Sequence, residues 1–306
     1  MKRSYLALIL VLAVAGVALA HNGVTGFIPT IPDPNAMVID GSEDDWAWID
    51  QDFIIAPEQI EAQSGDGTGL GGNGVPDDFS ASYRMGWSPP PDNSLYLFAR
   101  VTDDTLGAAE SEVKRNWWND DTLEFNMDMD HSGGPMSWTS TEEVYNGYRI
   151  NIHPLFDSQL GGTISIDLQE PGLEDWGALP PYCTTAATLL PADAGHLSPN
   201  VEYTYEMKIS PPFVRYDILG PESSIPHVFA PDQVIGLHTL WMDRDREAHG
   251  QQSIFGRTGS GFNTAANGDH LCDYVIVETV DLANYPTVST AVEHTTWGRI
   301  KNHIGH

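Results

Sequence analysis

The sequence predicts an all-β protein: an antiparallel, jelly-roll-like β-sandwich with long loop insertions and one short C-terminal helix. Apolar and polar residues alternate with period two along several short stretches, a pattern typical of half-buried strands. The chain has 29 Gly and 21 Pro among 306 residues, a content that indicates many turns and few long helices. No helical periodicity separates the strand candidates, which argues against a parallel β-α-β architecture.

The clearest strand candidate is 79–87, where large apolar residues alternate with small or polar ones. Short strands bounded by Gly, Pro, Asn or Asp, without intervening helices, favour a sandwich. Residues 64–78, glycine-rich and acidic, predict a mobile surface loop, and 169–200, which contains Pro180-Pro181, predicts an extended insertion. The further strand candidates are 95–102, 122–129, 148–153, 163–168, 201–209, 234–241 and 271–279.

The N-terminus has the pattern of a secretory signal peptide. Lys2 and Arg3 precede an apolar run over 6–17, and Ala18-Leu19-Ala20 is an A-x-A cleavage pattern. Cleavage after Ala20 predicts an extracellular or periplasmic protein, with an uncleaved anchor as the alternative. No later apolar stretch approaches the roughly 18–20 residues of a membrane span.

The predicted organisation is therefore a signal peptide over 1–20, a sandwich domain over 36–280 and a tail over 281–306. Trp297, Ile300 and Ile304 would share one face of a short amphipathic helix in that tail. The helix is interpreted as a docked terminus or as a contact to an envelope or protein partner.

Charge and cysteine content limit the partners further. The formal net charge is -29, which excludes a general nucleic-acid binder because a phosphate backbone would be repelled. Such an acidic surface suits neutral ligands and cations. The two cysteines, Cys183 and Cys272, could pair in an oxidising compartment or stay as buried thiols.

The common catalytic motifs are absent. The sequence contains no H-E-x-x-H, G-x-S-x-G, C-x-x-C, G-x-G-x-x-G or P-loop pattern. The histidines are scattered, and none forms a spaced ligand cluster with another His or Cys. We therefore predict no catalytic residues and a non-enzymatic protein, which could act beside glycoside hydrolases supplied by partner proteins.

Several strand-linked motifs follow one another in a definite order, and this order resembles the family 9 carbohydrate-binding modules and the wider group of DOMON-like β-sandwiches. The pattern there runs I-D-G-x-x-D-x-W, L-Y-x-x-x-x-V-x-D, W-x-x-D-S-V-E-x-F-x-D, Y-x-V-E-x-x-I and I-G-F-x-x-x-x-x-D. The resemblance covers roughly 38–278. The matching segments here are Ile39-Asp40-Gly41 with Trp46, Leu95-Tyr96-Leu97 with Asp103-Asp104, Trp118 to Asp128, Tyr148 to Asn151, Tyr205 to Ile209, and Ile235-Gly236-Leu237 leading to Asp243 and Asp245.

The resemblance implies a non-catalytic site for an oligo- or polysaccharide. Trp118 would stack on a sugar ring, and Glu124, six residues later, would accept hydrogen bonds from its hydroxyls. Arg149 would donate to them from the neighbouring strand, with Asn151 beside it. The family's second stacking Trp has no counterpart; the nearest aromatic residue is Phe255.

Other readings of the same residues stay open. Trp117 or Trp118 could plug the sandwich edge, with Glu124 and Arg149 as a structural pair. Relatives of this fold also carry haem, so a haem-binding electron-transfer domain is one alternative function, and a cell-surface structural or adhesion protein is another.

The resemblance also implies a structural calcium ion. The oxygen-rich candidates are the Asp128–Asp130 turn and Asp103-Asp104, and Asp243–Asp245 is similar. Solvated carboxylate runs would explain the same residues.

Overall fold

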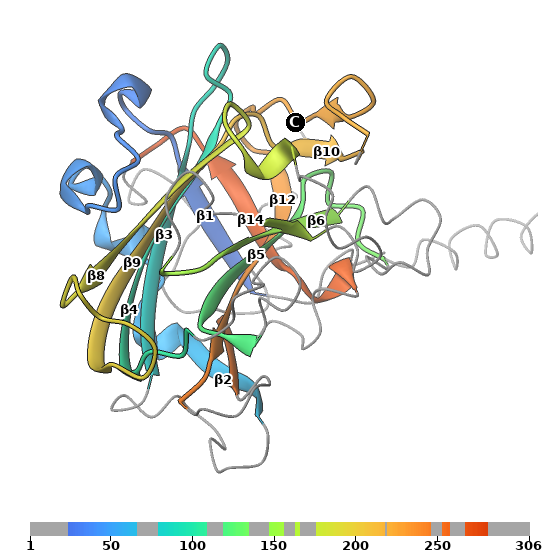
Figure 1. Cartoon of the computed structure of the whole chain (residues 1–306). Coiled ribbons are helices and arrows are strands. Elements are labelled where there is room, and N and C mark those ends of the chain that lie inside the picture. The colour runs from blue at the N-terminus through green and yellow to red at the C-terminus, as the bar shows by residue number, and fades with distance from the viewer. Residues whose placement is uncertain are drawn as a thin grey trace, which may run out of the picture.

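The computed structural model describes residues 24–65, 79–108, 119–134, 147–155, 163–165, 176–217, 219–245, 253–257 and 267–280. The main strands form two sheets that pack face to face (Figure 1), so the predicted all-β sandwich is confirmed. The strands are β1 (Thr25–Pro29), β2 (Ile60–Gly65), β3 (Phe79–Trp87), β4 (Leu95–Thr105), β5 (Thr122–Asp128), β6 (Gly147–Ile152), β7 (Thr163–Ser165), β8 (Cys183–Leu190), β9 (Pro199–Ile209), β10 (Phe213–Arg215), β11 (Ile225–Pro226), β12 (Val234–Asp243), β13 (Ser253–Arg257) and β14 (Cys272–Val277).

The smaller of the two, which we call sheet B, has the order β3-β4-β9-β8 and is antiparallel throughout. In β3 the side chains of Phe79, Tyr83 and Trp87 point into the core, as the alternation predicts. The stretch predicted as an insertion over 169–200 contains β8, which forms an edge of this sheet. Its sequence, CTTAATLL, is rich in small residues and therefore gives a weak strand pattern.

The larger sheet, sheet A, has the order β1-β14-β12-β5-β6-β7. β12 pairs with β14 along 234–237 and with β13 along 240–243, and β13 continues to β2. β1 runs parallel to β14, whereas the other pairs are antiparallel. Because β1 precedes residue 36, the sandwich begins earlier in the chain than the motif order predicts.

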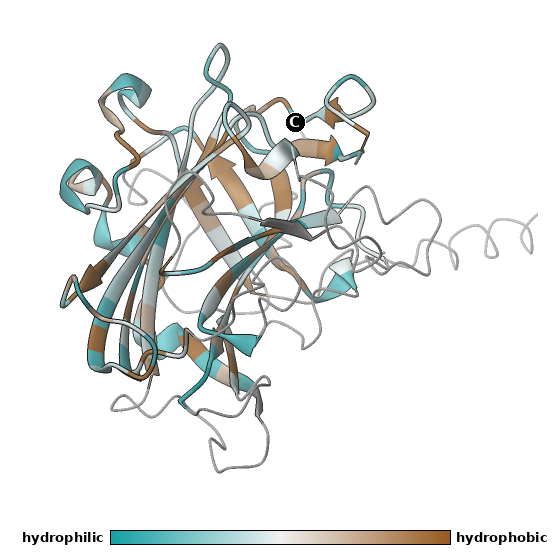
Figure 2. Ribbon diagram, viewed as in Figure 1, coloured by the Kyte–Doolittle hydropathy of each residue, from teal (hydrophilic) through white to brown (hydrophobic). Residues whose placement is uncertain are grey.

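The core lies between the sheets, and apolar residues recur along the strands of both (Figure 2). Two tyrosines connect the layers: the hydroxyls of Tyr83 on β3 and Tyr274 on β14 are 2.7 Å apart. Cys183 and Cys272 are both buried free thiols, so the structure forms no bridge between them. Burial raises the pKa of Cys183 to about 12 and that of Cys272 to about 11, which makes both thiols unreactive at neutral pH.

The segment between β1 and β2 covers part of the outer face of sheet B around Trp46, and its Ile49 and Phe53 pack against β14 of sheet A. It contains four short 3-10 turns: η1 (Pro34–Ala36), η2 (Asp44–Trp46), η3 (Gln51–Phe53) and η4 (Pro57–Gln59). Trp46 is buried against Tyr96 and Phe98 of β4, and its indole Nε1 donates to Oε1 of Glu206 at 2.8 Å. The backbone N–H groups of Asp40 and Gly41 donate to Oε2 of the same carboxyl, each at 2.9 Å.

The first motif, Ile39-Asp40-Gly41 with Trp46, therefore has a structural role: it donates the hydrogen bonds that hold the carboxyl of Glu206. Gly41 has φ +81, a left-handed conformation that glycine adopts without strain. The predicted helix in the tail, most of the 64–78 loop and the signal-peptide region lie outside the described residues. No helix in the described ranges is both long and apolar enough to span a membrane.

Candidate functional site

Five polar side chains meet on the outer face of sheet A, the face turned away from sheet B. Leu123, Phe125 and Met127 of β5 point into the core, so the residues between them must point outward. The strand register places Asn126 opposite His238 on β12 and Arg149 on β6, and it places Glu124 opposite Asn151. We call Glu124, Asn126, Arg149, Asn151 and His238 the outer-face cluster.

Glu124 is the centre of this cluster. Its side chain is 1% exposed, and its Oε2 lies 3.2 Å from Nη1 of Arg149, whose side chain is 14% exposed. Oε1 accepts a 2.7 Å hydrogen bond from Nδ2 of Asn126. Both carboxylate oxygens are therefore held in place by side chains, while a carboxylate can accept further bonds on its remaining lone pairs.

His238 adds a polar but uncharged ring to the cluster. Burial, and to a lesser extent the charge of Arg257, lower its pKa to about 3, so the imidazole is neutral at physiological pH. The cluster thus combines one cation and one anion with amide and imidazole groups. A site of zero net charge with many donors and acceptors suits an uncharged, hydroxyl-rich ligand.

Of the two predicted stacking residues, the structure describes only Phe255. Trp118 lies outside the described residues. Phe255 is fully buried, and its ring stacks on Phe79 of β3 with centroids 4.4 Å apart. The register pairs Phe255 with Trp241, which points into the core, so in this structure Phe255 belongs to the core and offers no face to a ligand.

The turn after β5, predicted as a calcium loop, is closed by its own hydrogen bonds. Oδ1 of Asp128 accepts the backbone N–H of Ser132 at 3.3 Å, and Oδ2 accepts that of Gly133 at 2.7 Å. Asp130 also accepts the N–H of Ser132, at 3.1 Å. These carboxylates stabilise the turn, which is the ordinary role of Asp in such a position.

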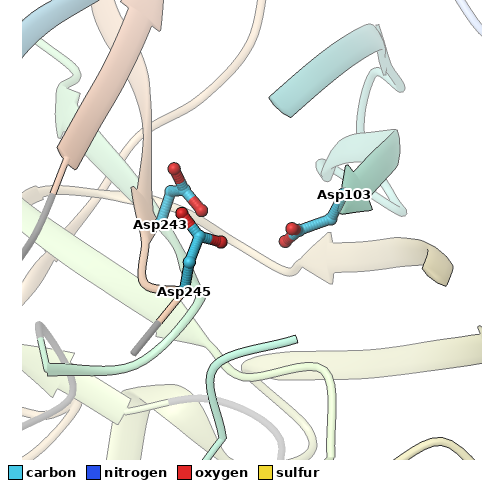
Figure 3. A group of neighbouring side chains, drawn as sticks. All are labelled: Asp103, Asp243 and Asp245. Atoms are coloured by element: carbon cyan, nitrogen blue, oxygen red, sulfur yellow. The ribbon is translucent and has the colours of Figure 1, made fainter. Parts of the chain in front are cut away.

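A second acidic group, not centred on the predicted Asp103-Asp104 pair, lies at one end of the sandwich. Figure 3 shows Asp243 and Asp245, from the end of β12, facing Asp103 of β4. One carboxylate oxygen of each lies within 4.8 Å of the others. Asp121, immediately before β5, is fully buried beside them. We call these four residues the aspartate cluster.

Burial raises the pKa of two members of the aspartate cluster, and neighbouring carboxylates raise it further. The pKa of Asp103 rises to about 6, and that of Asp121 rises well above its ordinary value because of burial and the charges of Asp103 and Asp243. Carboxylates this close oppose one another's ionisation. Asp104 lies next to the cluster and adds to the pKa of Asp103.

Sequence reasoning missed Asn126, His238 and Asp121 as site residues, whereas it named Asp103 and Asp243–Asp245 as separate oxygen-rich candidates. Asn126 stands where the family pattern has Phe, two residues after the Glu. This departure from the pattern could have indicated a polar site residue. The proximity of His238 depends on β12 lying next to β5, which no local pattern encodes.

Comparison with solved structures identifies the fold. The chain is similar to a family 9 carbohydrate-binding module from Caldicellulosiruptor kristjanssonii in complex with cellotriose, with 15% sequence identity, a TM-score of 0.53, and coverage of 85% of this chain and 96% of that chain. It is also similar to a family 9 carbohydrate-binding module from the same organism in complex with glucose. The sequence identity is 14% and the TM-score is 0.53, with coverage of 83% of this chain and 96% of that chain. The sequence matches no protein-family model and no curated protein. The resemblance predicted from the motif order is confirmed at the level of the fold: the chain has the architecture of a family 9 carbohydrate-binding module.

Proposed function

We propose that this protein is a non-catalytic carbohydrate-binding protein that acts outside the cell and binds an uncharged sugar through the outer-face cluster. The observation that carries the proposal is the buried Glu124–Arg149 pair, with Asn151 opposite Glu124 on the next strand. The structural neighbours supply independent support, since the similar modules were solved in complex with cellotriose and with glucose.

The chemistry of a pyranose matches these groups. Its hydroxyls need acceptors and donors in pairs, which Glu124, Arg149 and Asn151 can provide. Asn126 holds one oxygen of Glu124, so this carboxylate need not reorganise when a hydroxyl approaches. Trp118, six residues before Glu124 in the sequence, would contribute the apolar stacking surface.

The net charge of the site and of the chain favours neutral over acidic sugars. Arg149 and Glu124 balance, His238 is neutral, and the whole chain carries a formal charge of -29. A uronic acid or a sulfated sugar would be repelled by this field.

Calorimetric titration of the chain from His21 onward tests the proposal. Glucose, cellobiose, cellotriose and other soluble neutral oligosaccharides should include at least one ligand, and binding should quench tryptophan fluorescence. Trp118→Ala should abolish the heat of binding and Trp118→Phe should weaken it. Trp48→Phe, a change at a half-buried indole of the sheet B cover, is the matched control.

Two outcomes would count against the proposal. If no neutral mono- or oligosaccharide gives heat at millimolar concentration, the carbohydrate-binding role fails. A Soret band in protein refolded with haem would favour the haem-carrying alternative instead.

A further inference from the structure

We propose that the free edge of strand β8 pairs with the same edge of a second copy of this chain, so that the protein forms a dimer by antiparallel strand addition. The contact uses the second half of β8, residues 187–190, at the outer margin of sheet B (Figure 1). It belongs to the other sheet from the outer-face cluster, and its test uses no sugar.

The first argument is the direction of the backbone groups along β8. The N–H of Ser210 donates to the carbonyl of Tyr182 at 2.8 Å, and the pairing with β9 continues from there along all of β8 without a shift in register. Hydrogen-bonded and non-hydrogen-bonded pairs alternate in an antiparallel ladder, so Ala187 and Leu189 turn their N–H and C=O groups away from β9. Within the described ranges, the N–H groups of these two residues have no hydrogen-bond partner.

The other parts of the edges of sheet B are closed. On β3, the opposite edge, Tyr83 and Ile55 exchange two backbone hydrogen bonds of 2.8 and 3.0 Å. At the start of β8, the N–H of Cys183 donates to the carbonyl of Leu179 at 3.1 Å. Thr185, the next residue whose backbone turns outward, is only 3% exposed. The free part of the edge is therefore the second half of β8.

This half of β8 lacks the features that usually keep an edge strand from pairing. Natural proteins protect such edges with lysine, proline, a bulge or a covering segment. The strand sequence, CTTAATLL, contains no charged residue and no proline, and its ladder with β9 contains no bulge. Thr188 is exposed and Leu190 is 65% exposed, and the end of the strand is coloured as hydrophobic in Figure 2.

A second copy of the same strand matches this edge. The chain has a formal charge of -29, but β8 is uncharged, so two copies meet there without like charges on paired residues. A two-fold axis at Thr188 places Ala187 of each copy opposite Leu189 of the other, and each of these pairs exchanges two N–H···O bonds. Thr188 then faces Thr188 of the second copy, which is a favourable cross-strand pair. An axis at Ala187 would instead use the buried Thr185.

The size of the contact makes the dimer weak. Four residues a side are far fewer than the roughly 20–30 of a standard interface, so half of the chain should be dimeric at about 10–100 µM. Because both copies are strongly acidic, their repulsion opposes association. Salt screens this repulsion and should therefore strengthen the dimer.

Sedimentation velocity of the chain from His21 onward tests the proposal. We expect the average sedimentation coefficient to rise from that of a monomer to that of a dimer between about 5 and about 500 µM. The rise should be steeper in about 0.5 M NaCl than in about 0.05 M NaCl. If the chain stays monomeric over this range at both salt concentrations, or grows beyond a dimer, the proposal is wrong.

Substitutions locate the contact. Thr188→Lys and Thr188→Glu each place like charges opposite one another and should weaken association at least tenfold, whereas an equimolar mixture of the two variants should restore it. Ala187→Pro removes an outward N–H without removing a bond to β9 and should also prevent pairing. If Ala187→Pro does not fold, the two Thr188 variants carry the test.

The matched control is Thr102→Lys, at an exposed position on the outer face of β4 in the same sheet. This variant should associate at least as strongly as the wild type. Dimerisation of wild-type strength in either Thr188 variant alone would place the contact elsewhere and overturn the proposal. A mixture that associates no better than its separate components would overturn it as well.

Discussion

Each sheet has one buried glutamate on its outer face, and each carboxylate is stabilised there by hydrogen-bond donors. The two sheets differ in where these donors come from. Glu206 on sheet B is held by two backbone N–H groups and the Trp46 indole, all from the covering segment. Glu124 on sheet A is held by side chains of its own and the neighbouring strand, Asn126 and Arg149. A carboxylate fixed by the backbone of a covering segment fastens that segment to the sheet. One fixed by side chains on the sheet itself fastens no covering segment, and under the proposed function it would accept hydrogen bonds from a sugar.

The largest effect on stability is expected for Glu206, which holds the covering segment on sheet B. Glu206→Ala leaves three N–H donors, two of them buried, without their acceptor and should lower the free energy of unfolding by about 3–5 kcal/mol. Urea unfolding measures this. If the variant loses sugar affinity while retaining wild-type stability, the assignment of roles to the two faces is reversed.

Replacing both Glu124 and Arg149 on sheet A should lower sugar affinity but leave stability nearly unchanged. The double variant Glu124→Gln/Arg149→Met removes both charges together, so its stability should stay within about 1 kcal/mol of the wild type. Its affinity for the sugar identified by titration should fall about a hundredfold, a loss of about 2.7 kcal/mol. Unchanged affinity would show that the pair is only structural.

A milder change sharpens the comparison on sheet B. Trp46→Phe keeps most of the packing against Phe98 but removes the N–H that donates to Glu206, and should lower stability by about 1–2 kcal/mol. Chemical denaturation with Trp48→Phe as control tests this. Equal losses in the two variants would mean that packing, not the hydrogen bond, explains the effect.

The smallest expected effect is a dependence of stability on pH. Burial raises the pKa of Glu206 from 4.5 to about 7, although its three N–H partners oppose the rise. A raised carboxyl pKa contributes stability that is complete below pH 4.5 and is lost as the pH approaches 7. The urea midpoint of the wild type should therefore fall between pH 5 and pH 8 at constant calcium, and Glu206→Gln should reduce this slope. Parallel pH profiles would contradict the expectation.

Alternation predicted most strands of both sheets, because buried strands with large apolar residues leave a strong local pattern. The family resemblance implied that Glu124 and Arg149 lie on neighbouring strands, and the structure places them 3.2 Å apart. The pattern failed at β8, where small residues alternate weakly. It also failed to show that Phe255 points inward, because that depends on the register with β12.

The aspartate cluster marks the limit of local patterns more clearly. Asp103, Asp121 and Asp243 belong to three different sequence motifs, and no motif indicates that its aspartate lies next to the other two. Their meeting depends on which strands are neighbours and on two sheets facing each other. Pairs of residues within one hairpin could be predicted, whereas a site built from three strands could not.

The parallel pairing of β1 with β14 fixes where attachments leave the domain. Because Val277 pairs with Pro29 while Thr25 pairs with Asp273, a linker fused after Val280 departs from the opposite end of the sheet to one fused before Val24. β12 runs antiparallel to β14, so Asp243 lies at the end remote from a C-terminal linker. Immobilising a chain truncated after Val280 through that end would therefore leave that acidic end directed toward solution.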